Sequence, residues 1–130
     1  SLTLRYIDAV EFDYASADGF RFLKDNLKID MGLPEALFEA SGVQRLPQSL
    51  RWQASFPCGE PAGTVHIRFA TGKKNDRPAL LWETMVRSTG DDIPNMPQDF
   101  GSWIESAHTI TSDWFFKLIE GDLERRFSGD

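Results

Sequence analysis

Five side chains able to do chemistry fall on three short segments in which apolar and polar residues alternate. They are Gln53, Ser55, His66, Arg68 and Glu83. If the three segments pair as neighbouring antiparallel strands, one face of the sheet carries two polar rows, Ser55–His66–Met85 and Gln53–Arg68–Glu83. The first row places a hydroxyl beside an imidazole. The second places a guanidinium between an amide and a carboxylate.

Each polar row has a functional and an ordinary interpretation. The Gln53–Arg68–Glu83 row could bind a charged ligand, but a solvated face with a surface ion pair worth about 0–1 kcal/mol is simpler. A serine beside a histidine, as in Ser55 and His66, is a combination that can form a nucleophile and its general base. A general base needs an orienting partner, and Met85 on the other side of His66 offers none. The rows therefore favour a domain without catalysis, and an enzyme using His66, Arg68 and Glu83 is the weakest of three hypotheses.

Patterns typical of metal and cofactor sites are weak or missing in the sequence. Glu105-x-x-His108 is half of a di-iron pattern, which needs a second copy and further carboxylates, so His108 is more simply a packing residue. Asp91-Asp92 and Asp76 lack the spacing of a calcium loop. Cys58 has no basic neighbour to activate its thiol. No P-loop, dinucleotide-binding, nucleophile-elbow or zincin motif occurs. The sequence predicts no metal and no cofactor.

The polar rows depend on three predicted strands, at residues 50–56, 65–69 and 80–87. Segments 57–63 and 72–77 are rich in Gly, Pro, Asn and Asp and predict the two hairpin loops. Matching like faces predicts six opposite pairs: Phe56–Val65, Ala54–Ile67, Trp52–Phe69, Phe69–Trp82, Ile67–Thr84 and Val65–Val86. The resulting apolar face would serve as the floor for a helix.

A strand and two short helices are predicted before these three strands. The strand is Leu2–Phe12, and Ile7-Asp8 spoils its alternation, which indicates a bulge or an edge position. Ser16 or Asp18 can cap the first helix. The second helix is expected at Glu35–Ala40, opened by a proline and stopped by Ser41-Gly42.

The last third of the chain predicts one long amphipathic helix over Met96–Phe127. Its apolar residues recur at steps of three and four: Phe100, Trp103, Ile104, Ala107, Phe115, Leu118, Ile119, Leu123 and Phe127. Pro97 suits the first turn, and Gly129 could cap the end. Gly121 inside the helix costs about 1 kcal/mol relative to Ala. This helix should press Phe115 and Ile119 against Trp52, Phe69 and Trp82.

The composition of the chain limits which kinds of partner and which cellular compartment suit it. The 130 residues suit one domain, and the net charge of −6 does not favour nucleic acid or an anionic membrane. A single cysteine excludes an internal disulfide, and no apolar run approaches the roughly 20 residues that span a bilayer. We expect a cytoplasmic protein. Because the chain starts at Ser1 and goes straight into a strand, we expect a C-terminal fragment of a longer protein.

Several motifs resemble an uncharacterised bacterial family that is sporadically distributed among genomes. They are Leu4-Arg5-Tyr6-Ile7, Trp103 with Ala107-His108, and the apolar positions Phe115, Ile119 and Leu123. Nearly all of this chain resembles the C-terminal half of the family's members, which often carry Asn where this chain has Asp8. The resemblance implies a cytoplasmic protein of unknown function with a missing N-terminal half as a partner. No catalytic role comes with it.

Together these observations predict an α+β domain spanning residues 1–130. Its elements are a strand, two short helices, a three-stranded antiparallel meander and a long C-terminal helix across the sheet, an order that resembles a helix-grip fold. Fold does not give function. The surplus of aromatic residues favours a non-catalytic interaction or assembly module, with Trp114 and Phe116 as interface candidates and a homodimer or other protein as partner. The alternative is a module that binds a small apolar ligand between helix and sheet.

Overall fold

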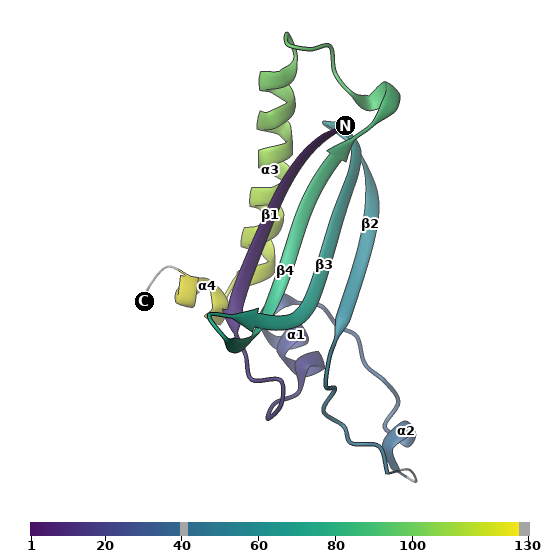
Figure 1. The fold of residues 1–130 in the computed structure, drawn as a ribbon, viewed down its shortest axis with the longest axis vertical. Coiled ribbons are helices and arrows are strands. Elements are labelled where there is room, and N and C mark those ends of the chain that lie inside the picture. Colours follow the sequence, from purple (N-terminus) through teal and green to yellow (C-terminus); the bar gives the residue numbers. More distant parts are fainter. Residues whose placement is uncertain (40–41, 128–130) are drawn as a thin grey trace.

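The fold is a four-stranded antiparallel sheet with a long helix on one face (Figure 1). The computed structural model describes residues 1–39 and 42–127. The elements in chain order are β1 (Leu2–Glu11), α1 (Gly19–Leu27), α2 (Ala36–Glu39), β2 (Arg51–Gly59), β3 (Ala62–Lys74), β4 (Arg77–Ser88), a 3-10 turn (Gly90–Asp92), α3 (Phe100–Ile119) and α4 (Asp122–Phe127). The predicted α+β class with a long helix across the sheet is confirmed. None of the described helices is long and apolar enough to cross a bilayer.

The strands lie in the order β1-β4-β3-β2, so β1 and β2 are the edges. All six pairs predicted from the alternation are found in the register of β2, β3 and β4. The edge position expected for the first strand is correct, but the bulge is not. Pairing between β1 and β4 is unbroken from Leu2 opposite Ser88 to Glu11 opposite Ala79. Asp8 breaks the apolar alternation because it lies on the helix-facing side.

The main core lies between the sheet and α3. Trp82 and Phe69 are buried at the centre of the sheet, and the Phe115 ring stacks on Trp82 with centroids 6.3 Å apart. Trp52 packs on Phe69 at 5.7 Å, and Ile119 belongs to the same cluster. This is the predicted aromatic platform. Burial of each large apolar side chain contributes about 1.5–3 kcal/mol, which is enough to hold the helix against the sheet.

The predicted single helix over residues 96–127 begins too early and is in fact two helices, α3 and α4, separated at Gly121. Helix α3 begins at Phe100, and the chain turns at Gly121, whose φ of 111° lies in the left-handed region that glycine favours. A second short helix, α4, then begins. The Lys28 ammonium donates to the carbonyl oxygens of Leu118 (3.1 Å) and Glu120 (2.8 Å), which satisfies carbonyls that the end of α3 leaves free. The proposed cap at Gly129 lies outside the described residues.

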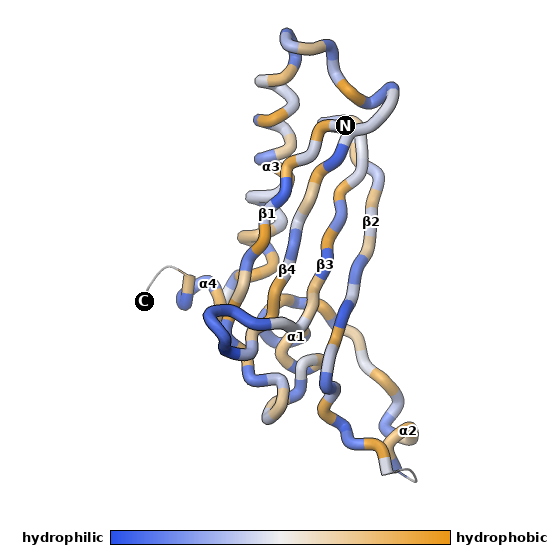
Figure 2. The backbone as a smooth tube through the Cα atoms, in the orientation of Figure 1, coloured by the Kyte–Doolittle hydropathy of each residue, from blue (hydrophilic) through white to orange (hydrophobic). Residues whose placement is uncertain are grey.

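Both hairpins are tighter than predicted because the strands are longer. The turn between β3 and β4 consists of Asn75 and Asp76, both with positive φ (53° and 65°), as type I′ hairpins require. Figure 2 shows this turn as a hydrophilic segment. Asp18 caps α1 by accepting from the Phe20 N–H at 2.9 Å. Helix α2 is found within the predicted range, whose last residue, Ala40, lies outside the described residues, as does Ser41.

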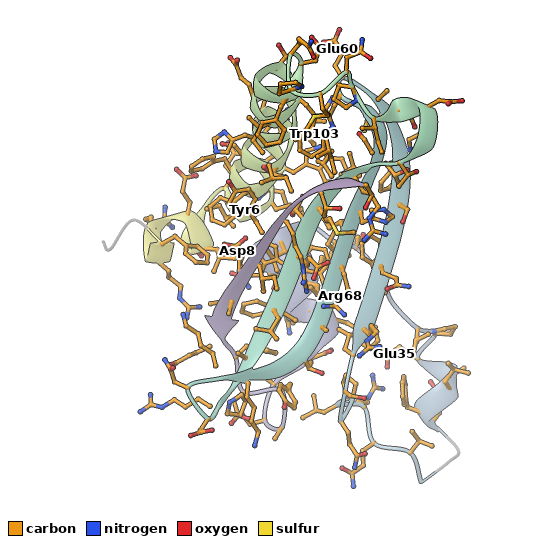
Figure 3. The ribbon with its side chains drawn as sticks, turned by 45° about the horizontal axis from the view of Figure 1, so that its top comes forward. Tyr6, Asp8, Glu35, Glu60, Arg68 and Trp103 are labelled. Carbon is orange, nitrogen blue, oxygen red and sulfur yellow. The ribbon has the colours of Figure 1, made fainter. Side chains whose placement is uncertain are left out.

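A buried hydroxyl ties the far end of the sheet to the start of α3. Ser88 Oγ donates to the Ala62 carbonyl at 2.5 Å and accepts from Trp103 Nε1 at 2.8 Å. Trp103 is buried beneath this end of the helix (Figure 3). The first turn of α3 is therefore held over β3 and β4.

Candidate functional site

The open face of the sheet carries an ion-pair cluster of two arginines on one carboxylate. Glu83 Oε2 lies 2.8 Å from Arg5 Nη2 and 3.3 Å from Arg68 Nη2, and only 14% of the Glu83 side chain is exposed. Gln53 pairs with Arg68 across β2 and β3, as predicted. The sequence did not reveal Arg5, because nothing in its pattern shows that β1 lies beside β4. The two guanidinium groups balance the charge of the Glu83 carboxylate and fix its position, so Glu83 is a poor candidate for a general base.

The predicted neighbours Ser55 and His66 do meet on this face. The hydroxyl Oγ and the imidazole Nδ1 lie 2.7 Å apart. A dyad that activates a nucleophile also needs a group that orients the imidazole. No carboxylate among the described residues bonds to His66, and Met85 is its neighbour on β4. A polar hollow of about 260 Å3 lies over this cluster. It contains charge but no nucleophile with an oriented base.

A second hollow, of about 240 Å3, lies along the seam between β1 and α3. Its walls are Tyr6, Asp8, Thr84, His108, Thr111, Ser112, Phe115 and Phe116. The Tyr6 ring meets His108 edge to face at 6.2 Å. Figure 3 shows Tyr6 and Asp8 on the side of β1 near the helix. Sequence reasoning missed this site, although the apolar alternation broken at Asp8 was a signal for it.

Asp8 is the unusual group of this seam. Its carboxyl is half-buried and accepts no hydrogen bond or ion pair from any residue that the structure describes. Burial raises the pKa of Asp8 above its ordinary value of 3.8, because the charged form loses solvation. An isolated carboxylate at the margin of an apolar core is destabilising unless something pairs with it.

We expect Asp8→Asn to stabilise the fold at pH 7 by less than about 1 kcal/mol, since the carboxyl is partly exposed. The folded chain holds the Asp8 proton more tightly than the unfolded chain does. The free energy of unfolding therefore falls as the pH rises from 3.8 through the pKa of Asp8 in the folded chain. The Asp8→Asn variant does not titrate at this position and so does not lose this stability. Urea unfolding at pH 3 and pH 7 measures the effect. An equal gain at both pH values, or an equal gain from the exposed control Asp30→Asn, contradicts it.

A third hollow, of about 310 Å3, lies on the other flank of α3 towards β2. It is almost wholly apolar and is lined by Ile29, Trp52, Phe56, Ile67, Trp114, Lys117 and Leu118. Trp114 meets Phe56 edge to face at 5.8 Å. Trp114 and Phe116, the two predicted interface residues, thus border different hollows on opposite flanks of the helix. Trp82 lines none of these hollows, since Phe115 covers it.

The remaining candidates give no metal or nucleophile site. Within residues 1–39 and 42–127, no three His, Cys, Asp or Glu side chains are placed to hold a metal ion. Glu105 and His108 are both exposed on α3. Burial, and then the charge of Asp92, raises the pKa of the Cys58 thiol, whose Sγ donates to the Pro61 carbonyl at 3.1 Å. A raised pKa disfavours the reactive thiolate.

Comparison with known proteins adds no family or activity. No family model matches the chain, and neither a curated protein nor a solved structure matches it. The resemblance to the sporadically distributed bacterial family stays a prediction.

Proposed function

We propose that this chain is a non-catalytic assembly module that joins chains through the free edge of β1. The observation that carries the proposal is that no strand within residues 1–39 and 42–127 pairs with the outer edge of β1, whose backbone donors and acceptors form an unbroken row. Such an edge pairs readily with another strand. With Cys58 as its single cysteine, the chain suits assembly in the cytoplasm.

The backbone alternation of β1 identifies the groups that face outwards. Just beyond β1, the Phe12 N–H donates to the Pro78 carbonyl at 3.0 Å, in the register that pairs β1 with β4. In an antiparallel ladder, residues bonded to one neighbour alternate with residues that point to the other side. The outward groups of β1 therefore belong to Thr3, Arg5, Ile7, Ala9 and Glu11. All five carry an N–H.

The other edge, β2, is a poorer template. The Thr71 N–H donates to the Leu50 carbonyl at 2.9 Å, so the same alternation directs the odd-numbered residues of β2 outwards. Pro57 is one of them and has no N–H. A proline on an edge strand interrupts pairing and protects the edge. The contrast between the two edges favours β1 as the joining strand.

Exposed apolar side chains flank the β1 edge. Ile7 is 54% exposed on the open face, and Phe116 is 56% exposed on α3 above the seam. Tyr6 is 42% exposed between them. Long edge strands with exposed apolar neighbours are rare in monomeric proteins, because they aggregate unless a partner covers them.

Proline substitution at an outward position tests the proposal. Ile7→Pro removes an outward N–H and leaves the bonds to β4 in place, and Gln53→Pro does the same at β2. We expect sedimentation velocity to show concentration-dependent association of the parent chain and of Gln53→Pro, and a monomer for Ile7→Pro. Circular dichroism checks that each variant is folded. A parent chain that is monomeric at hundreds of micromolar overturns the proposal, and so does association that survives Ile7→Pro.

A second candidate function is binding of a small apolar ligand, which the hollow beside Trp52 and Trp114 favours. Pockets for small molecules are largely apolar with a few polar groups, and Lys117 at the rim could meet an anionic head group. An anilinonaphthalene sulfonate probe tests it. Saturable binding lost in Phe56→Glu and kept in Phe116→Glu supports this function. Binding that is absent, or equally affected by both changes, removes it.

A further inference from the structure

We propose that the partner at the β1 edge is a second copy of this chain, paired antiparallel with Ile7 on the twofold axis. This inference rests on the proposed function, since it identifies the occupant and the register of the same edge. A twofold pair would continue the sheet from one copy into the other, with β1 of each copy at the centre.

The side chains of β1 select the register. Like faces meet only when the axis passes through a residue, because the side-chain period is two. An axis at Arg5 or at Asp8 sets like charges opposite each other, which is destabilising. An axis at Tyr6 sets the Asp8 carboxyl against the partner's Leu4, and one at Ala9 leaves a short overlap. An axis at Ile7 avoids all of these and pairs residues 3 to 11.

In the Ile7 register, Asp8 gains a hydrogen-bond donor, which none of the described residues of its own chain supplies. The partner's Tyr6 lies directly opposite Asp8 on the helix-facing side, and by symmetry the contact forms twice. A charge pointing inwards from an edge strand ordinarily discourages pairing. A phenol donating to the carboxylate removes that penalty, so the unpaired Asp8 favours this partner over a strand with an apolar residue at that position.

The position of α3 agrees with the same arrangement. Helix α3 contacts β4 and β1 (Figure 1). A twofold axis perpendicular to the sheet keeps both helices on one face, about two strand spacings apart. At roughly 4.8 Å per strand the helix axes lie about 10 Å apart, which is near the 8–10 Å of packed helices. Phe116, exposed on the seam side of α3, would then be covered.

Cysteine cross-linking measures the register directly. Cys58→Ser removes the single native cysteine, so each introduced cysteine acts alone. We expect Ile7→Cys to form a disulfide-linked dimer under mild oxidation. Arg5→Cys and Ala9→Cys should cross-link when mixed and not separately, because residue 5 lies opposite the partner's residue 9. Gln53→Cys on β2 is the control for random collision.

Other outcomes overturn the inference in distinguishable ways. Cross-links between Arg5→Cys and Ile7→Cys chains place the axis at Tyr6, and cross-links between Ile7→Cys and Ala9→Cys chains place it at Asp8. Either result rejects the Ile7 register but keeps assembly through β1. Association that Ile7→Pro abolishes rejects symmetric pairing if none of these cross-links forms and neither Arg5→Cys nor Ala9→Cys forms a disulfide-linked dimer by itself. A monomeric parent chain rejects the proposed function itself.

Tyr6→Phe tests the hydrogen bond that defines the pair. It removes the hydroxyl and keeps the ring that meets His108. We expect the dissociation constant of the dimer to rise at least about tenfold, since a hydrogen bond to a charged group is lost at two symmetric places. The unfolding of the monomer at low concentration should hardly change. An unchanged dissociation constant contradicts the Asp8–Tyr6 contact.

Discussion

Trp82→Ala is expected to lower the free energy of unfolding by about 3–5 kcal/mol, the range for removing a buried aromatic side chain. Trp82 is 1% exposed, and the rings of Phe115 and Phe127 pack on it from α3 and α4. Its loss leaves a cavity where the sheet meets both helices. Urea unfolding followed by circular dichroism at micromolar concentration measures the change.

Trp82→Phe is the matched control, and we expect it to cost much less than Trp82→Ala. Among the described residues, Trp82 Nε1 is the buried side-chain donor that has no hydrogen-bond partner. Phenylalanine keeps most of the ring packing and removes a donor whose desolvation is uncompensated. If both variants lose equal stability, the indole N–H has a partner or the ring size is critical. Either result contradicts the expectation that Trp82→Phe costs much less because the indole N–H of Trp82 adds nothing to stability.

Gly63→Ala is expected to cost at least about 2 kcal/mol, towards the upper end of the range for overpacking. A Cβ at Gly63 would collide with the backbone carbonyl oxygen of Arg87 and lie 2.9 Å from Ser88 Oγ. The Arg87 backbone belongs to a central strand and cannot move without breaking its pairing. The same change disturbs the hydroxyl that anchors Trp103. Chemical denaturation reports the loss.

Gly59→Ala, in the same hairpin, separates the collision from a general effect of losing glycine. A Cβ there meets no atom within 4 Å. We expect a change within about 0.5 kcal/mol, as at ordinary surface positions. Comparable losses for the two variants would show that backbone entropy, not close approach to β4, decides the effect at Gly63.

The pairing of β2, β3 and β4 was predictable because three alternating segments joined by two turns leave few ways to match their faces. The polar row of Gln53, Arg68 and Glu83 followed from the same arithmetic. The place of β1 could not be obtained in this way, since its partner is distant in sequence. The sequence therefore does not place Arg5 in the predicted cluster, and the break in alternation at Asp8 predicts an irregular strand instead of a seam beside α3.

The end of α3 shows another limit of periodicity. Apolar residues keep their helical spacing across Gly121, because α4 turns Leu123 back onto the same core. The pattern alone therefore predicts one helix where there are two. The Lys28 ammonium, which bonds the last carbonyls of α3, comes from a segment about ninety residues earlier. Helical periodicity carries no information about such a cap.

The bonds from Lys28 to the end of α3 also constrain how the protein matures on the ribosome. The first strand must wait for β4 to emerge, and the end of α1 waits still longer, until Leu118 and Glu120 have left the exit tunnel. Nascent chains released before that point would lack the Lys28 bonds to the end of α3 and the packing of Phe127 on Trp82. These contacts therefore form only after residue 120 has left the tunnel, with slow closure typical of long-range pairing.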